Sequence, residues 1–293
     1  MGGFEGGDEG GFWDEDAISN LIYKPTPKNR HKDKSYLQKA DSSYLIKAHA
    51  KINIFLKIKK FQEQTPSFLS RVVLADNIYD TISFVPCECE YFTIEGCEGV
   101  ALENNSIYKA YEALIEFTAD SDIEDFFCEY KVVVNKSIPY NSGLSGASSD
   151  ASAFIRLVKE ACNLVLSTDE LIRIAKMVSP DVVFFIYNYS SANVSDVIEY
   201  FEEEPLNFEL FPINEQLDTQ LLYQTFQQKL STTIDLSSFE HWQKLDSRNL
   251  LKSIQRPEYL NDLYNAAVLA YPNVKEHTQE NLFFSNSSFY KLL

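Results

Sequence analysis

At the middle of the chain stands Ile138-Pro139-Tyr140-Asn141-Ser142-Gly143-Leu144-Ser145-Gly146-Ala147-Ser148-Ser149-Asp150-Ala151. The preceding run Tyr130–Val134 predicts a strand, and an amphipathic helix is expected to begin near Ser148. A loop of small residues that ends on a helix N-terminus directs backbone N–H groups and the positive end of the helix dipole at an anion. The pattern therefore favours a phosphate-binding loop. An ordinary strand-to-helix turn with serine caps is the alternative.

The helix expected after this loop carries apolar residues at helical spacing. They are Ala151, Phe154, Ile155, Val158, Cys162 and Val165, and this spacing is typical of a helix with one buried face. Asp150 lies just inside the helix, so it places one carboxylate beside whatever the loop holds.

The composition describes a globular protein, with 45% hydrophobic and 24% charged residues among 293. The formal charge of −17 argues against nucleic acid and anionic membranes as partners, because both reward Lys and Arg. No apolar run reaches the roughly 18 to 20 residues that span a bilayer, and the N-terminus does not resemble a signal peptide. We expect no membrane association and a monomer or weak homodimer.

Cysteine and glycine usage add two further expectations. Five cysteines in a chain of this length do not form a disulfide framework, so a reducing cytoplasm is expected. Cys87, Cys89 and Cys97 match no standard zinc spacing and are expected to be strand thiols. Of the 10 glycines, only Gly96, Gly99, Gly143 and Gly146 follow the first 11 residues. Phosphate loops depend on glycine, so this depletion counts against catalytic activity.

Residues 1–43 are Gly-rich and acidic, then basic, without sustained periodicity, which predicts a flexible or loosely docked extension. From Tyr44 to Ile58 polar and apolar residues alternate as in a half-buried strand. The acidic run Glu202–Pro205 is expected to connect two domains, at 44–200 and 201–293. Strands mixed with helices in both parts predict an α+β fold of two packed units.

The other expected elements follow from periodicity and capping residues. The expected strands are Arg71–Leu74, Asp80–Val85, Glu90–Ile94, Leu282–Phe284 and Phe289–Leu292. The expected helices begin after Asn105 and at the capping box Ser167–Glu170, and lie at Gln216–Leu230, Phe239–Leu245 and Tyr259–Ala270. The apolar run Val182–Ile186 is expected to be a buried strand or turn.

Several motifs, taken in order, resemble the GHMP kinase superfamily over residues 44 to 293. Ala50-Lys51-Ile52-Asn53-Ile54-Phe55-Leu56 is similar to the motif A-K-I-N-L-F-L, and Asp76–Ile82 and Asn105–Ala110 match the segments that follow. The central stretch resembles the ATP loop P-x-x-A-G-L-G-G-G-S-S-D-A. Ser179–Phe185 resembles G-A-D-V-P-F-F, Ser191–Ser195 continues the similarity, and Phe284–Phe289 stands where the family has S-G-S-G-S.

The resemblance implies a two-domain GHMP kinase fold, with an N-terminal ribosomal-protein-S5-like domain and a C-terminal ferredoxin-like α/β sandwich. It also implies transfer of the γ-phosphoryl group of ATP to the 2-hydroxyl of a cytidine-diphosphate-linked methylerythritol, in non-mevalonate isoprenoid precursor biosynthesis. Such a reaction depends mainly on positioning and charge stabilisation.

The resemblance also assigns roles to residues. Asp150 would accept the proton of the substrate hydroxyl, and Lys51 would keep that carboxylate ionised. Residues Pro139 to Ser149 would wrap the triphosphate, with Ser148 or Ser149 near Mg²⁺. Asn53 would lie on the substrate side. Phe185 would stack on the cytosine ring, with a place in the core as its alternative.

Departures from the family pattern leave other functions open. The loop has Ser145-Gly146-Ala147 where the family has three glycines, and a side chain on a residue with positive φ would cost about 1 kcal/mol. The family's aromatic-His pair falls in Phe61–Phe68, which contains no histidine. A degenerate member that acts as a scaffold, or a kinase with another acceptor such as homoserine or mevalonate, therefore remains an alternative.

Overall fold

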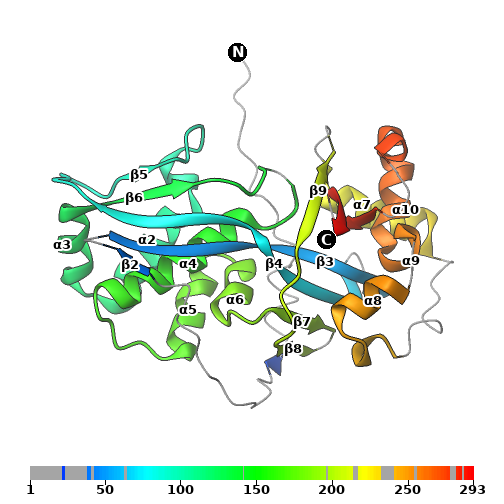
Figure 1. Ribbon diagram of the computed structural model, residues 1–293, viewed down its shortest axis with the longest axis horizontal. Coiled ribbons are helices and arrows are strands. Elements are labelled where there is room, and N and C mark those ends of the chain that lie inside the picture. The colour runs from blue at the N-terminus through cyan, green and yellow to red at the C-terminus, as the bar shows by residue number, and fades with distance from the viewer. Residues whose placement is uncertain are drawn as a thin grey trace.

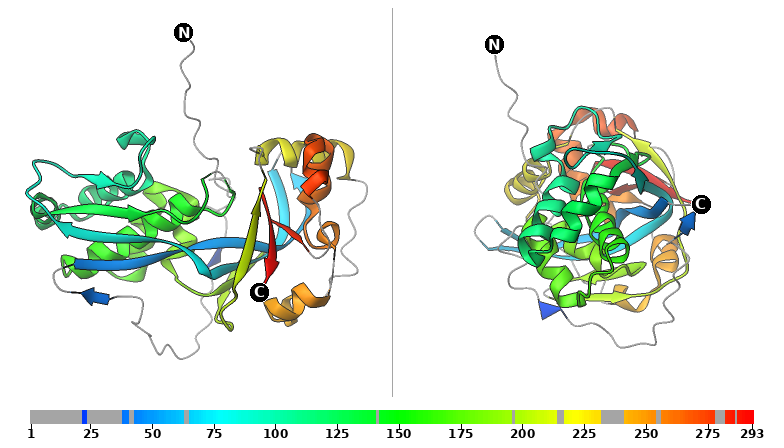
Figure 2. Two further views of the ribbon diagram at one scale, coloured as in Figure 1. Left: turned by 45° about the horizontal axis from the view of Figure 1, so that its top comes forward. Right: turned by 90° about the vertical axis from the view of Figure 1, so that its left-hand side faces the viewer.

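The computed structural model describes residues 22–23, 38–40, 43–62, 65–140, 142–195, 197–213, 217–231, 241–253, 256–277, 282–285 and 287–293. Figures 1 and 2 show an elongated molecule in which β3 and β4 run between two groups of elements. Helices α2 to α6 gather at one end, and α7 to α10 lie with a small sheet at the other.

The strands are β1 (Ile22–Tyr23), β2 (Gln38–Ala40), β3 (Ser43–Gln62), β4 (Thr65–Pro86), β5 (Ile94–Glu95), β6 (Tyr130–Asn135), β7 (Ser191–Val194), β8 (Val197–Phe201), β9 (Phe208–Pro212), β10 (Phe283–Ser285) and β11 (Ser288–Leu292). The helices are α2 (Ser106–Thr118), α3 (Ser121–Glu129), α4 (Gly146–Ala161), α5 (Thr168–Val178), α6 (Pro180–Ile186), α7 (Thr219–Lys229), α8 (Ser247–Ser253), α9 (Pro257–Leu260) and α10 (Asp262–Ala270). Short 3₁₀ turns are η1 (Leu102–Asn104), η4 (Trp242–Lys244) and η5 (Pro272–His277).

A long antiparallel hairpin of β3 and β4 forms the spine of the molecule. It belongs to an eight-stranded sheet with the order β1-β8-β7-β4-β3-β2, in which β6 also pairs with β4 and with β5. The two runs expected at Arg71–Leu74 and Asp80–Val85 are parts of the single strand β4. Between these runs, residues 75–78 have no register partner in β3. Ala75 forms a bridge with Leu206 instead, and Asp76 N donates to Leu206 O.

Helix α4 covers one face of this sheet and packs against β3, α2 and α6. The alternation predicted for β3 is confirmed in its first half, where Ile46 and Ala48 are buried and Lys47 and His49 are half-buried. The expected buried face of α4 is also confirmed up to Val158. Val165 is an exception, because α4 ends at Ala161 and the Val165 side chain is 99% exposed.

The second group of elements is built on the antiparallel sheet β10-β11-β9. Helices α7 and α10 pack on each other, and their apolar residues share a core with Leu56 and Ile58 of β3. The α+β class is therefore confirmed, while β3 and β4 contribute to the cores of both groups. The domain boundary near residue 200 stays a prediction.

Some local expectations are confirmed and others are wrong. Asn105 caps α2, and Ser167 with Glu170 forms the capping box of α5. Val182–Ile186 is helical, since a short apolar run has no periodicity that separates strand from helix. The helix expected over 259–270 is divided by Asn261, which caps α10, and the run Phe239–Leu245 yields only the turn η4 in its described part. Helix α3 and strands β7 to β9 are additional to the expected elements.

Two short parts of the N-terminal extension join the large sheet. Ile22–Tyr23 pairs in parallel with β8, and Gln38–Ala40 pairs antiparallel with the start of β3. The other expectations for residues 1–43 lie outside the described residues.

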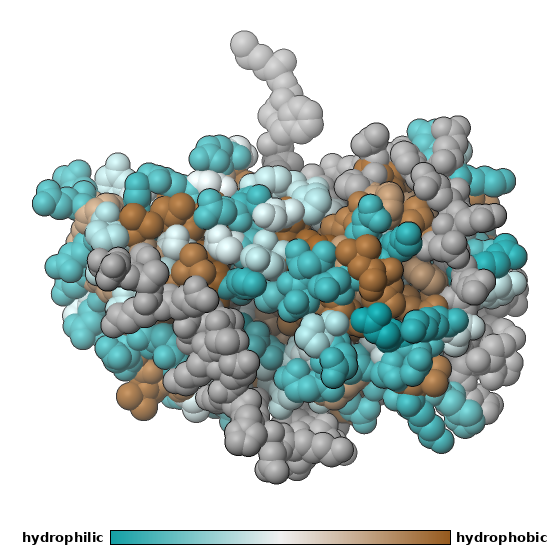
Figure 3. Space-filling view, viewed as in Figure 1, coloured by the Kyte–Doolittle hydropathy of each residue, from teal (hydrophilic) through white to brown (hydrophobic). Residues whose placement is uncertain are grey.

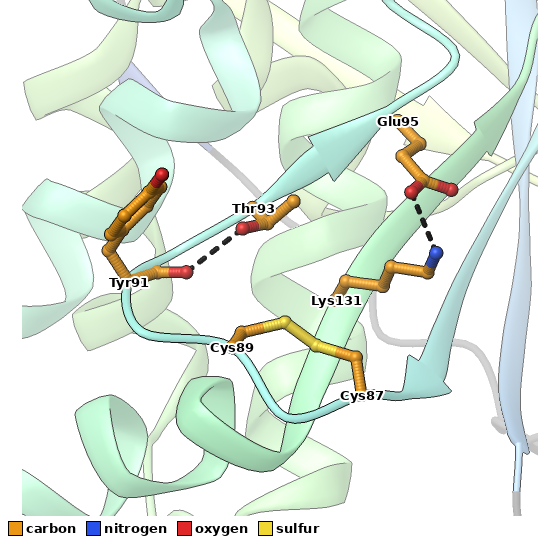
Figure 4. The surroundings of a disulfide bond; sticks show 6 residues. All are labelled: Cys87, Cys89, Tyr91, Thr93, Glu95 and Lys131. Carbon is orange, nitrogen blue, oxygen red and sulfur yellow. Dashed lines mark hydrogen bonds and ion pairs between the residues drawn. A yellow bond between two sulfur atoms is a disulfide. The ribbon is translucent and has the colours of Figure 1, made fainter.

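The expectation of strand thiols at Cys87 and Cys89 is wrong. Both residues follow β4, and their sulfur atoms are joined by a disulfide bond, next to the ion pair of Lys131 and Glu95 (Figure 4). Their Cα atoms are 5.6 Å apart, within the usual range for a disulfide. The course of the backbone after β4 brings the two cysteines within this distance. Their spacing in the sequence alone does not reveal that they can form a disulfide bond. Cys97 is a free thiol.

Hydrophilic residues cover much of the face in Figure 3, and hydrophobic residues gather around β9, where the two groups of elements meet. Among the described residues, none of the helices combines the length and the apolar character needed to cross a membrane.

Candidate active site

The outer edge of β3 gathers segments that lie far apart in the sequence. Strand β2 pairs only with Ser43–Leu45, so other segments meet the edge beyond it. His49 O accepts from Ser149 Oγ (2.8 Å), Lys51 N donates to Leu144 O (3.0 Å), and Asn53 N donates to Ser285 Oγ (3.1 Å). The phosphate-binding loop (Pro139–Ser149), the start of α4 and the β10–β11 hairpin therefore meet along β3.

Two hydrogen bonds hold the phosphate-binding loop at Ser142. Ser142 Oγ donates to Pro139 O at 2.7 Å, and Ser288 Oγ from the β10–β11 turn donates to Ser142 O at 3.1 Å. Helix α4 starts at Gly146, two residues before the expected start near Ser148. The loop thus ends on the N-terminus of a long helix, as an anion cradle requires. Asn141 lies outside the described residues.

The two loop residues that replace glycine, Ser145 and Ala147, differ in backbone conformation. Ser145 adopts the left-handed conformation, with φ 54° and ψ 40°, so its side chain stands where glycine is favoured. Ala147 lies inside α4 and has no such cost.

Lys51 and Asp181 form a buried ion pair. Lys51 Nζ is 3.3 Å from Asp181 Oδ2, and the two side chains are 0% and 4% exposed. Burial lowers the pKa of Lys51, and the charge of Asp181 opposes that shift. Asp181 lies in the first turn of α6, where the helix dipole favours a carboxylate. The pair therefore presents a carboxylate and an ammonium group in a water-poor environment.

The expected pairing of Lys51 with Asp150 is wrong, because Asp150 contacts Lys136 instead. Lys136 Nζ lies 2.7 Å from Asp150 Oδ2 and 2.5 Å from Asp80 Oδ2. Asp80 Oδ1 also accepts from the backbone N–H of Ile138 at 2.8 Å. Burial raises the pKa of Asp150 to about 7, although Lys136 opposes the shift. Lys136 precedes the loop and Asp150 follows it, so this cluster closes the loop at its base.

The two expected substrate contacts have different surroundings. Asn53 is 0% exposed, and its side-chain Oδ1 and Nδ2 have no hydrogen-bond partner among the described residues. Phe185 is 4% exposed and packs edge-on against Phe184, with ring centroids 5.2 Å apart. It lies in a cluster with Val72 and Tyr200. Phe185 thus occupies the core, as its alternative interpretation predicts, and offers almost no ring face to a ligand.

Several buried polar atoms on β3, α4 and α6 have no hydrogen-bond partner within the described part of the chain. They are Asn53 Oδ1 and Nδ2, Asp150 Oδ1, Ser152 Oγ and Asp181 Oδ1. A folded protein rarely leaves such atoms unsatisfied without water, an ion or a ligand to meet them. This set of donors and acceptors suits a polar ligand with hydroxyl groups.

Sequence reasoning missed Asp181 as a site residue, although its motif was recognised. The signal was present in Ser179-Pro180-Asp181, because proline at the first helical position followed by an acid is typical of a helix start. Interpreting the next residues as a strand concealed it. Asp80 and Lys136 were missed because their contact with Asp150 depends on tertiary structure.

Replacing Ser285 with Ala tests whether the β10–β11 turn supports the site. The Asn53 N–H would lose its buried acceptor, at a cost of about 1–3 kcal/mol in the free energy of unfolding. Ser121→Ala, at an exposed position on α3, is the control and should change stability by less than about 0.5 kcal/mol. Denaturant unfolding measures both, and equal stability of the two variants would contradict the role of Ser285.

Comparison with known proteins extends these observations. The family described as GHMP kinases N terminal domain matches residues 105–189. A protein of Sulfurovum sp. (strain NBC37-1) named 4-diphosphocytidyl-2-C-methyl-D-erythritol kinase is 47% identical over 247 residues, covering 83% of this chain and 96% of that protein. A protein of Campylobacter jejuni (strain RM1221) with the same name is 32% identical over 248 residues, with the same coverage.

Two solved structures share the fold at low sequence identity. The crystal structure of 4-(cytidine 5'-diphospho)-2C-methyl-D-erythritol kinase has a TM-score of 0.67 and 19% identity, over 85% of this chain and 89% of that one. L. major mevalonate kinase has a TM-score of 0.55 and 12% identity, over 88% and 90%. The fold is therefore that of GHMP kinases, as expected. Together with the identities above, this shows that the chain belongs to the 4-diphosphocytidyl-2-C-methyl-D-erythritol kinase family of the GHMP kinases.

Proposed function

We propose that the protein transfers the γ-phosphoryl group of ATP to the 2-hydroxyl of 4-diphosphocytidyl-2-C-methyl-D-erythritol, a step in non-mevalonate isoprenoid precursor biosynthesis. One observation carries the proposal. The buried Lys51–Asp181 pair, with its 3.3 Å contact, lies where β3 gathers the loop and the start of α4. Family membership at 47% identity supports the substrate.

In this proposal Asp181, and not Asp150, accepts the proton of the substrate hydroxyl. Asp181 Oδ1 is buried without a hydrogen-bond partner among the described residues, so it is available to a hydroxyl group. Lys51 keeps the carboxylate ionised and stabilises negative charge as the phosphoryl group moves. Asn53 contributes a buried amide on the same side of β3.

Residues Pro139 to Ser149 hold the triphosphate, through the backbone N–H groups that follow Pro139 and through the α4 dipole. The cluster of Asp80, Lys136 and Asp150 sets the shape of this loop. Bound Mg²⁺ would neutralise phosphate charge, with Ser148 or Ser149 beside it. Ser149 already donates its hydroxyl to His49 O, so the more exposed Ser148 is the better candidate.

The proposal is tested with the purified chain, Mg-ATP and the cytidylated substrate. We expect substrate-dependent release of ADP and a product that carries the new phosphate on the 2-hydroxyl. Homoserine and mevalonate serve as alternative acceptors, and 2-C-methylerythritol 4-phosphate tests the need for the cytidine group. If only homoserine or mevalonate is phosphorylated, the proposed substrate is wrong and that acceptor takes its place. Absence of turnover with every acceptor would favour a scaffold. We further propose that the reaction takes place in the cytoplasm, which the use of ATP and a nucleotide-linked substrate supports. We also propose that the protein acts as a monomer or weak homodimer.

A further inference from the structure

Ser145 holds a backbone conformation that its residue type disfavours. Its φ of 54° and ψ of 40° are left-handed, which is uncommon for a residue with a Cβ atom. The GHMP-type loop pattern has glycine at this place, for which the conformation carries no steric cost. Non-glycine residues kept in this region cluster at functional sites.

The hydroxyl of Ser145 does not compensate by capping α4. Ser145 is the N-cap residue of α4, but its side chain accepts no hydrogen bond from the helix. Ser145 Oγ instead donates to Asp181 Oδ2, at 3.0 Å. The left-handed backbone therefore accompanies a side chain that reaches α6, not its own helix.

The contacts of the Asp181 carboxylate are divided between its two oxygens. Oδ2 accepts from Ser145 and lies 3.3 Å from Lys51 Nζ. Oδ1 is buried and has no hydrogen-bond partner within the described part of the chain. Two partners on one oxygen fix the rotation of the carboxylate and leave the other oxygen available.

We infer that Ser145 is a positioning residue that orients the Asp181 carboxylate, so that Oδ1 is the atom that receives the substrate proton. The inference rests on the proposed function, because it assigns Asp181 as the base. The serine that replaces glycine in the loop thus contributes to the reaction geometry. Its hydroxyl acts through Asp181 and does not contact the phosphoryl group.

Two substitutions separate the hydroxyl from the backbone. Ser145→Ala removes the hydroxyl and keeps the left-handed strain, whereas Ser145→Gly removes both. We expect kcat to fall about tenfold in both variants, because the loss of one hydrogen bond to a charged group has an effect of about that size. The KM for ATP should not change. The Gly variant should melt about 2–4 °C above the Ala variant, because only Gly relieves the strain.

A merely structural role predicts a different pattern, since activity would then follow thermal stability. Wild-type kcat in Ser145→Gly, or a kcat that rises with Tm from Ala to Gly, overturns the inference. Ser253→Ala is the control, since Ser253 lies exposed on α8 and its hydroxyl donates to Leu250 O. It should keep wild-type kcat.

The same assay separates the two proposals. A wild-type protein that forms no phosphorylated product contradicts the proposed function, and the Ser145 inference falls with it. An active wild type with an equally active Ser145→Gly variant contradicts the Ser145 inference alone.

Discussion

Replacing Asp181 with Asn is expected to lower kcat by about 10³-fold, within the range that general bases contribute, while the KM for ATP changes little. Asn keeps the size of the side chain but cannot accept the substrate proton. Lys51 loses its carboxylate partner, so burial should depress its pKa further. Steady-state kinetics measures the loss, and calorimetric titration with Mg-ATP verifies that the variant retains its nucleotide site.

Two further variants make this prediction specific to the Lys51–Asp181 pair. Lys51→Met should lose activity to a similar extent, and the double variant should be no worse than either single one, because residues that act as a unit are not additive. Asp150→Asn should lose much less, about tenfold at most, since Asp150 bonds to Lys136 at 2.7 Å. An active Asp181→Asn combined with an inactive Asp150→Asn would return the role of base to Asp150.

The second large effect is expected at Arg71, which is 0% exposed where β4, β7 and the C-terminal elements meet. Its Nε donates to Asn193 Oδ1 at 2.5 Å, and its Nη1 donates to Leu245 O at 3.0 Å and to Glu203 Oε1 at 3.5 Å. The Trp242 ring lies 5.5 Å from the Arg71 guanidinium carbon. Arg71 thus joins the end of the large sheet to the chain that leads into α8.

Arg71→Met should lower the free energy of unfolding by about 3–5 kcal/mol, because it leaves the half-buried Glu203 without its cation and the buried Asn193 and Leu245 oxygens without their donor. Tm should fall by about 10 °C. Arg71→Lys should recover only part of the loss, since an ammonium group cannot reproduce the planar fork. Arg173→Met, at an exposed position on α5, is the matched control. A small effect at Arg71, similar to that at Arg173, would show that the other contacts suffice to join these elements.

Much of the architecture followed from local pattern. The alternation in the first half of β3, the apolar face of α4 up to Val158 and the capping box of α5 each depend on residues close together in the sequence, and all three are confirmed. Local signals failed where they were short or ambiguous. The apolar run Val182–Ile186 showed no hydrophobic periodicity that separates a helix from a strand. At Asn261 one helix ends and the next begins, although a single helix was expected.

Burial along β3 illustrates what the alternation of polar and apolar residues does not predict. Simple alternation places Lys51 on the same face as the half-buried Lys47 and His49. The pairing register with β4 shifts between His49 and Lys51, because β4 carries the extra residues 75–78 there, which is a bulge in the neighbouring strand. Ala50 and Lys51 are both fully buried. A bulge depends on hydrogen bonding with the neighbouring strand, so the sequence of β3 alone does not reveal it.

The sequence by itself determined the family, the order of its motifs, and the placement of a small-residue loop between a strand and a helix. Only the tertiary structure decided which carboxylate meets Lys51. Asp181 lies in the first turn of α6 and Asp150 lies one turn further into α4, and both belong to recognised motifs. Their partners depend on how α4 packs against β3 and α6, so that Lys51 meets Asp181 and Asp150 meets Lys136.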